Sequence, residues 1–386
     1  MAISRHIEKS ASSKPHTYTV LLVCDFSQGL VSRLMDVYNF FREPPQIVLV
    51  RRGKRISFDT PLSIHEETIP LPVVGLENLS FLKALPVLLS YLLWILVLYG
   101  RICRLKIRVK LVHSQNIFPQ GLFGLLLARL LNVPLIVTAT GRDVNVTMTK
   151  WAPIRAVCLM ILQRALVTAV SKPLQKTLLK FGLSQILYVP NSVDPSAIPA
   201  VDESAKRDSI LYVGLMTKNK RPLLLLQAFE IVIRAYPTAT LYMCGDGPQM
   251  EIVKREIVTR GLADRAKCLS SVSQRTLNQI RAKTALFVLP SATEGLSLAL
   301  LEAMAAGQAV IASRNASHEA ILENERTALL FRVDDSEELA RQIMVAISDD
   351  DLRTKISQSA KALIERDFSN IVVARQWEST YLSALT

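Results

Sequence analysis

The segment after a predicted buried strand at 285–289 carries two glutamates, Glu294 and Glu302, with seven residues between them. Gly295 allows a tight turn, and we expect a helix to begin near Leu296. The first amides of a helix have no partner inside it, so this helix start is suited to bind an anion such as a diphosphate. Glu302 stands among Leu and Ala residues, where a carboxylate needs a polar partner that ribose hydroxyls could supply. The alternative is that Glu294 is a capping-loop acid and Glu302 a solvated helix residue.

Short apolar runs alternate with helical stretches along the chain and predict the elements that would position these glutamates. This alternation is typical of an α/β fold with parallel sheets flanked by helices. A turn at 191–195 separates two such sets, so we predict two Rossmann-like domains. We expect strands at 18–24, 46–50, 109–113, 134–138 and 166–170, then at 209–213, 239–243, 266–269, 285–289 and 309–312. Helices of the second set are expected at 220–235, 247–260, 273–282, 296–306, 317–322 and 335–348.

Length and composition agree with two packed domains. The chain has 386 residues, of which 50% are hydrophobic and 20% charged, and this composition excludes a disordered protein. Its five cysteines show no metal-ligand spacing, and we interpret them as buried thiols in a reducing compartment. Residues 1–19 lack the apolar core of a signal peptide, so we expect a cytoplasmic location.

Positive charge gathers in the first half of the chain. Residues 1–190 hold 23 Lys and Arg against 9 Asp and Glu, whereas the remainder is nearly balanced. A surplus of this size predicts an anionic partner, which could be nucleic acid, a membrane surface or a phosphorylated substrate. Nucleic acid is disfavoured, because no recognition motif is present and aromatic residues are few.

Residues 84–99 are nearly all apolar, and a basic run from Arg101 to Lys110 follows them. A transmembrane helix needs about 20 apolar residues; this run is shorter and lies between two strands of one predicted sheet. A helix buried against the sheet explains one apolar face. A helix at a membrane surface explains both the apolar residues all round and the basic run, and the pattern favours it. We therefore expect residues 81–110 to meet an anionic membrane surface, with the protein peripheral on its cytoplasmic face.

Several further segments follow one recognisable order around the two glutamates. They are Asn191-Ser192-Val193-Asp194, Val213-Gly214 followed by Lys220-Arg221-Pro222, Gly245-Asp246-Gly247-Pro248, Ser317-His318-Glu319, and a terminal helix within Phe368–Leu385. With the spacing of Glu294 and Glu302, they resemble the retaining family 4 glycosyltransferases of the GT-B type over nearly all of residues 18–386. The resemblance implies two facing Rossmann-like domains with parallel sheets, and a C-terminal helix that crosses back to the first domain. We place an acceptor-binding domain at 1–190, a nucleotide-sugar-binding domain at 191–365 and the returning helix at 366–386.

The resemblance implies a donor site in the second half. Glu302 is expected to bind the ribose hydroxyls of a nucleotide sugar and Glu294 the hydroxyls of the transferred sugar. Lys220, with Arg221, is expected to neutralise the leaving diphosphate, where a fixed cation stabilises the charge that bond breakage creates. The implied donor-binding set is Gly214, Lys220, Arg221, Gly295, Leu296, Ser297, Glu302 and His318. His318 lies either near the phosphates or on the surface.

The acceptor side is predicted in the first half, at strand ends that face the crevice. The candidates are Gly29, His113, Arg142 and Asp143. Asp143 could orient or deprotonate the acceptor hydroxyl, or it could form only a local salt bridge with Arg142. A dedicated base is not required in this family, because the leaving phosphate can take the proton.

Two positions depart from the family pattern. Leu215 stands where an arginine is usual, so one diphosphate cation is missing, and Lys218 or Arg221 could replace it. Thr140 stands where many relatives have histidine. These departures leave room for a divergent or inactive member.

Three functions follow from these observations. The first is a retaining transferase that moves a sugar from a nucleotide-diphosphate donor to a lipid-linked acceptor at a membrane. The second is the same chemistry on a soluble acceptor, and the third is a non-catalytic partner that binds sugar nucleotides. No cofactor or metal is expected, since no Asp-x-Asp ends a strand, and Asp334-Asp335 and Asp349-Asp350-Asp351 are interpreted as helix starts or solvated turns. The sequence leaves the base, the sugar and the linkage open, and an epimerase on a similar scaffold is a further alternative.

Overall fold

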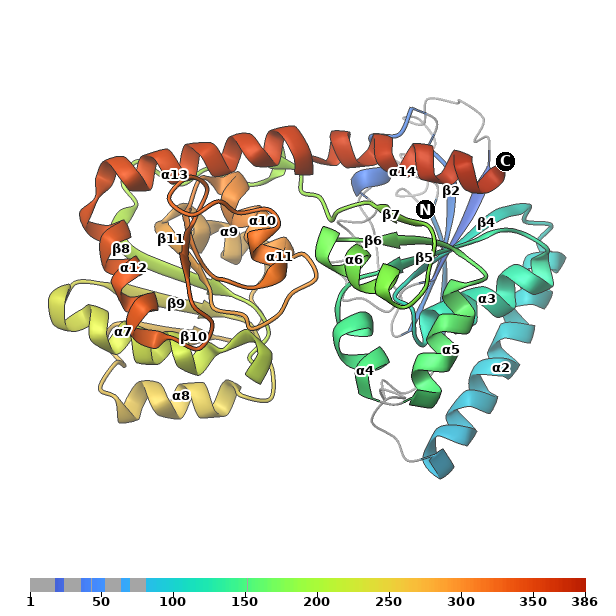
Figure 1. The fold of residues 1–386 in the computed structure, drawn as a ribbon, viewed down its shortest axis with the longest axis horizontal. Helices are drawn as coiled ribbons and strands as arrows, with labels where there is room; N and C mark the ends of the chain where they lie inside the picture. Colours follow the sequence, from blue (N-terminus) through green and yellow to red (C-terminus); the bar gives the residue numbers. More distant parts are fainter. Residues whose placement is uncertain (1–17, 24–35, 43, 53–63, 70–80, 151) are drawn as a thin grey trace, which may run out of the picture. The chain divides into compact units, whose positions relative to one another are not determined.

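The chain folds into two α/β units, each built on its own parallel sheet (Figure 1). The computed structural model describes residues 18–23, 36–42, 44–52, 64–69, 81–150 and 152–386. The first unit contains residues 1–190 together with 370–386, and the second contains residues 191–369. The chain therefore returns to the first unit at Asn370, just after the π-helical turn η6 (Ile364–Phe368) in which we had expected the boundary.

Seven strands of the described residues form the sheet of the first unit. They are β1 (Thr19–Val23), β2 (Gln46–Arg52), β3 (Ile64–Ile69), β4 (Val109–Gln115), β5 (Leu135–Ala139), β6 (Leu166–Ala169) and β7 (Ile186–Tyr188). All pairings are parallel, in the order β3-β2-β1-β4-β5-β6-β7. Strands β1 and β5 are buried along their whole length, as expected for a parallel sheet covered on both faces.

Six parallel strands form the sheet of the second unit. They are β8 (Lys206–Val213), β9 (Thr240–Cys244), β10 (Ala266–Leu269), β11 (Thr284–Leu289), β12 (Ala309–Ser313) and β13 (Leu329–Phe331). Their order is β10-β9-β8-β11-β12-β13. The direction in which the strands are added reverses between β8 and β11, and an open α/β sheet binds ligands outside the carboxyl ends of its strands at such a point.

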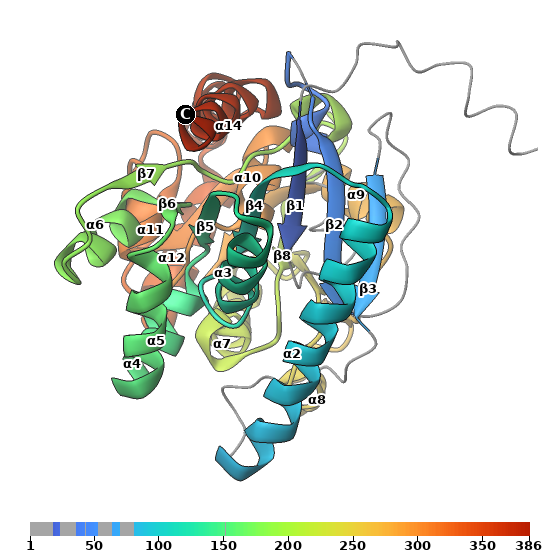
Figure 2. The same cartoon turned by 90° about the vertical axis from the view of Figure 1, so that its right-hand side faces the viewer.

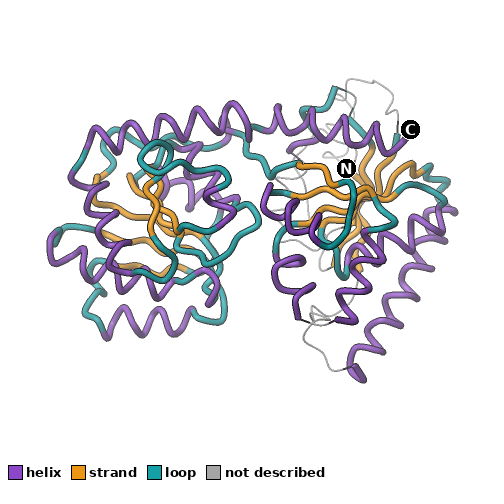
Figure 3. The backbone as a smooth tube through the Cα atoms, in the orientation of Figure 1, coloured by secondary structure: helices purple, strands orange, loops and turns teal. Residues whose placement is uncertain are grey.

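Helices surround the strands of each unit (Figure 3). In the first unit, the helices bounded by described residues include α2 (Phe81–Arg104), α3 (Gln120–Leu131), η3 (Asp143–Thr147), α4 (Met148–Lys150), α5 (Ala152–Leu162), α6 (Lys172–Lys180) and α14 (Asn370–Leu385). In the second unit they are η4 (Pro195–Ala197), η5 (Lys218–Lys220), α7 (Pro222–Ala235), α8 (Met250–Thr259), α9 (Gln274–Ala282), α10 (Leu298–Ala306), α11 (Ala316–Glu319), α12 (Ser336–Ser348) and α13 (Asp350–Leu363).

The two-domain α/β fold expected from the sequence is confirmed, and every predicted strand is present. Three strands were missed: β3, β7 and β13. All three lie at the edges of their sheets. β3 carries two acidic residues in its centre, while the apolar runs of β7 and β13 are only three residues long, which is too short to be recognised as strands.

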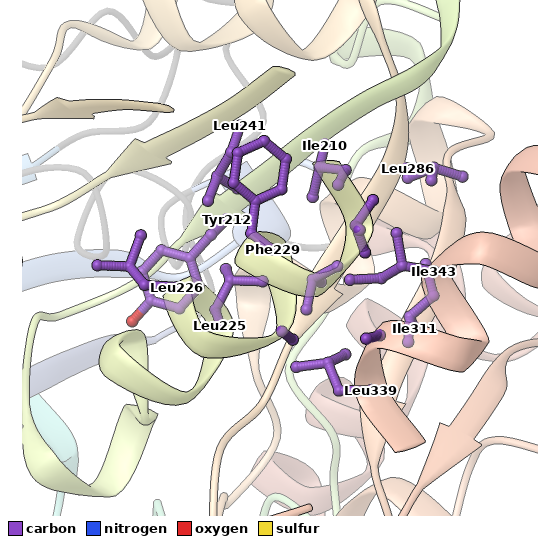
Figure 4. Packing of buried hydrophobic residues seen from close by; sticks show 14 of the residues in the cluster. Ile210, Tyr212, Leu225, Leu226, Phe229, Leu241, Leu286, Ile311, Leu339 and Ile343 are labelled. Atoms are coloured by element: carbon purple, nitrogen blue, oxygen red, sulfur yellow. The ribbon is translucent and has the colours of Figure 1, made fainter. Parts of the chain in front are cut away.

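The core of the second unit fixes the helix that follows the reversal point. Figure 4 shows Leu225 and Phe229 of α7 packed among side chains of the sheet, which include Ile210 and Tyr212 of β8. Leu225, Phe229 and Val232 are fully buried and recur at helical spacing on one face of α7. This packing holds both ends of the loop that joins β8 to α7.

Helix α14 belongs to the core of the first unit. Its residues Val373, Trp377 and Tyr381 are buried at four-residue spacing and pack in one cluster with Tyr38 and Phe41. The C-terminal segment thereby completes a hydrophobic core whose other members come from the first part of the chain.

Helix α2 has two apolar faces, and it runs along the outside of the first unit (Figure 2). Ile95 and Leu98 are buried, whereas Leu93, Leu96 and Val97 are 65%, 58% and 50% exposed. Packing against the unit thus accounts for one face only. In the described part of the chain, no helix combines the length and apolar character needed to cross a membrane.

The four cysteines that the structure describes are free thiols. Cys158 and Cys244 are buried and Cys268 is partly buried. The prediction of buried thiols is wrong for Cys103, which lies exposed near the end of α2, and Cys24 lies outside the described residues.

Candidate functional site

Lys220 and Glu294 come from different loops of the second unit and form an ion pair. Lys220 ends η5, which follows β8, and Glu294 lies in the loop that follows β11. These are the two neighbouring strands between which the strand order reverses. The Lys220 and Glu294 side chains are 18% and 9% exposed, so a cation and a carboxylate meet at the place where this fold binds ligands.

Asn219 ties these two loops together. Its Nδ2 donates to the carbonyl of Thr293 over 2.8 Å, and its Oδ1 accepts from the Thr293 hydroxyl over 2.8 Å. Its backbone carbonyl also accepts from the amide of Ala292. Sequence reasoning missed Asn219, because an asparagine between two lysines is typical of a solvated turn. These three hydrogen bonds of Asn219 fix Lys220 beside Glu294.

The turn at Gly245-Asp246-Gly247 supports the same loop. A Cβ atom on Gly245 would lie 2.0 Å from the Gly214 carbonyl oxygen, and one on Gly247 would lie 2.7 Å from that of Met216. Both glycines also have positive φ angles, so no other residue fits there without moving the backbone. The amide of Met216 donates to the carbonyl of Asp246 over 2.8 Å. These glycines therefore have a structural role beneath the loop that carries Lys220.

Helix α10 begins at Leu298, two residues after the expected start. Ser297 keeps an extended conformation as the N-cap, and its Oγ lies 3.4 Å from the amide of Leu300, the donor in this capping contact. The helix-start amides without a partner inside the helix are therefore those of Leu298 and Ala299, in addition to the capped Leu300.

Two side chains hold the loop that leads into α10. The Ser317 hydroxyl donates to the carbonyl of Glu294 over 2.7 Å, and Asn191 Nδ2 donates to the carbonyl of Leu296 over 2.8 Å. Gly295 lies between these two anchored carbonyls. Asn191 and Ser317 both belong to the segments that carried the family resemblance, and these contacts give each a physical function.

Arg221 has an internal partner that the sequence did not predict. Its guanidinium pairs with the Asp334 carboxylate through Nε, and its Nη2 lies 3.0 Å from Asp334 Oδ2. This bidentate contact raises the pKa of Arg221 and lowers that of Asp334. Arg221 is thus directed to Asp334, whereas the exposed Lys218 and the partly buried Lys220 beside Glu294 are the other two cations of this loop. Of the expected helix starts, Asp335 caps α12 and Asp349 caps α13.

Glu302 is buried and forms an ion pair with Arg281 of α9. Nη2 of Arg281 lies 2.6 Å from Oε2 of Glu302, and the two side chains are 1% and 3% exposed. The expectation that an acid in this apolar helix needs a polar partner is thus met from within the chain. The interpretation of Glu302 as a solvated helix residue is wrong.

His318 is buried, so the alternative of a surface histidine is wrong. Its Nδ1 lies 2.8 Å from the carbonyl oxygen of Ser313 and 3.0 Å from Nδ2 of Asn315. Burial lowers the pKa of His318, and the nearby Glu294 opposes this shift. Nε2 finds no hydrogen-bond partner among the residues that the structure describes, so it is the ring nitrogen left for a ligand.

His113 anchors helix α14 instead of lining an open strand end. It is fully buried, with Nδ1 2.7 Å from the Tyr381 hydroxyl and Nε2 2.8 Å from the Thr138 hydroxyl. The Tyr381 hydroxyl in turn lies 2.6 Å from that of Tyr38. Burial lowers the pKa of His113 to about 3, so its ring is neutral. With both nitrogens engaged, His113 has no group left for an acceptor molecule.

Asp143 organises the turn after β5. Its carboxylate is 3% exposed and accepts from the amides of Gly141 at 2.8 Å, Val144 at 3.0 Å and Ile117 at 3.1 Å. A fourth amide, that of Thr140, lies 3.2 Å away. Burial raises the pKa of Asp143, and these amides oppose the shift. The carboxylate thus holds the backbone, and it forms no ion pair with Arg142, which is exposed.

The remaining acceptor-side candidates are less informative. Gly29 lies outside the described residues. Thr140, which replaces the usual histidine, donates through its hydroxyl to the side chain of Asn116. Over the described ranges, His, Cys, Asp and Glu nowhere gather in threes in a way that could hold a metal ion.

Two family models match the chain, one in each half. Residues 23–197 match Glycosyltransferase Family 4, and residues 195–363 match Glycosyl transferases group 1. Among similar curated proteins, N-acetyl-alpha-D-glucosaminyl L-malate synthase of Bacillus anthracis is 23% identical over 294 residues, which cover 71% of this chain and 75% of that protein. The UDP-Gal:alpha-D-GlcNAc-diphosphoundecaprenol alpha-1,3-galactosyltransferase of Escherichia coli is 26% identical over 77% of this chain and 78% of that protein.

Solved structures share the fold at low sequence identity. Sucrose-phosphate synthase from Thermosynechococcus elongatus superposes with a TM-score of 0.77 at 18% identity, over 95% of this chain and 98% of that one. HepE from Anabaena, solved in complex with UDP and glucose, has a TM-score of 0.75 at 18% identity, over 95% of this chain and 100% of that one.

Proposed function

Because the chain belongs to the GT-B glycosyltransferases described by the family 4 and group 1 models, we propose that it transfers a sugar from a UDP-sugar to a lipid-linked acceptor, with retention at the anomeric carbon. The observation that carries the donor part is the Lys220–Glu294 pair where the strand order of the second sheet reverses. The name of the Escherichia coli relative includes UDP-Gal, and the Anabaena structure contains UDP, which supports UDP as the nucleotide.

The donor is bound by the loops that follow β8 and β11. The diphosphate lies against Lys220 and Lys218 and the first amides of α10, where backbone N–H groups and the helix dipole favour negative charge. Glu294 accepts hydrogen bonds from hydroxyls of the transferred sugar, and Nε2 of His318 forms one more hydrogen bond with that sugar. Glu302 receives the ribose hydroxyls.

In the transfer step the bond between the anomeric carbon and the phosphate oxygen breaks, and its electron pair leaves with UDP. Lys220 stabilises that charge as it develops, since a positioned cation is effective in a site with little water. The acceptor hydroxyl forms the new bond on the face that the phosphate leaves, and its proton passes to the departing phosphate oxygen. Asp143 has no part in this scheme, because its carboxylate is buried among backbone amides. The scheme uses no metal.

The exposed face of α2 supports a lipid-linked acceptor. Leu93, Leu96 and Val97 expose half or more of their side chains, and the exposed basic residues Arg101 and Arg104 follow in the last turn of the same helix. An apolar stripe next to basic residues is the arrangement by which surface helices bind anionic membranes. The diphosphoundecaprenol in the name of the Escherichia coli relative is an acceptor of this lipid class.

A transfer assay tests the proposal. The purified chain is incubated with UDP-galactose or UDP-N-acetylglucosamine and a diphospholipid-linked sugar, and released UDP and product are measured. NMR of the product then gives the anomeric configuration. Inversion would contradict the retaining mechanism, and the absence of both UDP binding and transfer would contradict the proposed enzyme.

A soluble acceptor is the second candidate, because the name of the Bacillus anthracis relative contains L-malate. Transfer to L-malate or to a free sugar in the absence of lipid, at a rate equal to that with the lipid-linked acceptor, would favour it. The exposed stripe of α2 has no function under this alternative.

A further inference from the structure

Arg281 is held at both of its terminal nitrogens in the second unit. Nη2 lies 2.6 Å from Glu302 Oε2, and Nη1 lies 2.6 Å from Oδ1 of Asn278, one turn earlier on α9. Arg281 is also the largest fully buried side chain among the described residues. A guanidinium that is fixed at two nitrogens has one orientation. It therefore donates its hydrogen bond to Glu302 in one direction only.

Burial of this pair is costly, and stability alone does not call for it. The attraction between two buried charges barely compensates for the free energy lost when both leave water. Packed apolar residues of similar volume often stabilise a core at least as well. Glu302 follows Leu300 and Leu301 and precedes Ala303, all of them buried apolar residues, so an apolar side chain would fit this part of α10. The pair therefore calls for a reason beyond packing.

We propose that Arg281 is a positioning residue for the nucleotide. It supplies the countercharge of Glu302 and fixes the direction of that carboxylate, so that Glu302 can accept hydrogen bonds from ribose hydroxyls. A carboxylate accepts hydrogen bonds and donates none, so it matches the two hydroxyl donors of a ribose and gains nothing from a sugar that lacks them. The inference rests on the proposed function, in which Glu302 binds the ribose of the donor.

Isothermal titration with matched nucleotides tests this role. UDP, GDP and ADP are each titrated beside their 2′,3′-dideoxy forms, and the ratio of the two dissociation constants gives the ribose preference. For the unaltered chain we expect a preference of at least about tenfold for one ribonucleotide. Arg281→Met is expected to remove this preference, because it weakens binding of the ribonucleotide and leaves the affinity of the dideoxy form little changed.

Two further variants keep the result clear if Arg281→Met does not fold. Arg281→Lys keeps the charge but cannot hold Glu302 and Asn278 together, so we expect a folded chain with a reduced ribose preference. Arg260→Met is the matched control, because Arg260 also pairs with glutamates of the second unit but is 27% exposed, and we expect it to keep the full preference.

Each outcome of these titrations has a distinct meaning. Equal weakening of ribose and dideoxy forms by Arg281→Lys or Arg281→Met would overturn the positioning role and leave only a structural one. A ribose preference that survives both variants would overturn it as well. If the unaltered chain binds none of the six nucleotides, the proposed function fails and the inference fails with it. Binding without any ribose preference would overturn the role of Glu302 and Arg281 alone.

Discussion

Nδ1 of His113 lies 2.7 Å from the hydroxyl of Tyr381, although 268 residues separate them in the chain. This contact joins β4 to α14, and the ring of Trp377 packs against the same imidazole at a centroid distance of 4.8 Å. The C-terminal helix is thus attached through a neutral histidine that water does not reach. Protonation of that histidine would place a charge inside the core.

This arrangement predicts acid sensitivity of the first unit. The pKa of His113 is about 3 in the folded chain and about 6.5 in an unfolded one. Below pH 6.5 the unfolded chain binds a proton that the folded chain excludes, so the contribution of His113 is complete above that pH. It is lost towards pH 3 at up to about 1.4 kcal/mol per pH unit.

Replacement of His113 by Gln tests this linkage. Gln cannot titrate, so we expect a lower stability at neutral pH and a shallower fall between pH 6.5 and 4. Urea unfolding followed by tryptophan fluorescence over a pH series gives both quantities. An identical acid slope in the two chains would show that His113 is not the group responsible.

Lys220 and Glu294 are expected to be needed for the transfer step. Loss of the Lys220 charge by substitution with Met removes the cation at the leaving phosphate, and a single such group is worth about 10²–10³ in kcat. Glu294→Gln keeps the shape but loses the charged acceptor, and we expect a smaller loss. Rates of UDP release from the UDP-sugar measure both effects.

The matched control for Lys220→Met is Lys254→Met. Lys254 lies in α8 of the same unit, is exposed and pairs with a single glutamate, Glu251. Its substitution should leave kcat unchanged. A similar fall in both variants would point to nonspecific loss of charge or stability rather than to the leaving phosphate.

Asn219 is expected to act through Lys220 rather than on the substrate. Asn219→Ala removes both side-chain contacts to Thr293, and a lost hydrogen bond of this kind costs about 1 kcal/mol. We expect kcat to fall about tenfold by loosening of the two loops. The fall in kcat should be absent from a chain that already carries Lys220→Met. Additive losses in the double variant would contradict a role of Asn219 in positioning Lys220.

The sequence predicted the positions of the loops after β8 and β11 well, because glycines and apolar runs are local signals. It could not predict the partner of Glu302, since Arg281 stands 21 residues earlier in the last turn of another helix. An arginine in the last turn of a helix is ordinarily a surface residue that meets the helix dipole. Only the packing of α9 against α10 brings the two charges together.

For the acceptor-side candidates His113 and Asp143, the sequence does not predict the role that the structure shows. Both are candidates because strand ends face ligands in this fold and both residues lie near strand ends. Burial decides their roles, and burial depends on α14 for His113 and on the turn after β5 for Asp143. Neither dependence is visible in residue types or in spacing.

Asp143 is therefore expected to affect stability more than chemistry. In Asp143→Asn the amide group can keep one accepting oxygen, but its NH₂ must face either the Ile117 amide or the amides of Gly141 and Val144. An unsatisfied buried donor of this kind costs about 1–3 kcal/mol. Chemical denaturation should show this loss, while kcat measured on the folded fraction stays close to that of the unaltered chain. A large fall in kcat without loss of stability would restore Asp143 as the base.

The exposed stripe of α2 gives the last prediction. Leu96→Glu replaces an apolar side chain that is 58% exposed with a charge, so it should not disturb the buried face formed by Ile95 and Leu98. Transfer of a leucine side chain out of water is worth about 1.5–3 kcal/mol, so we expect at least about tenfold weaker binding to phosphatidylglycerol vesicles in flotation.

Val258→Glu is the matched control, because Val258 is 70% exposed on α8 of the second unit. Binding of the unaltered chain should weaken with salt and be weak on phosphatidylcholine, since basic residues next to the stripe attract anionic lipid. If Leu96→Glu and Val258→Glu float equally well, the stripe does not meet the membrane, and the soluble acceptor becomes the better explanation of the site.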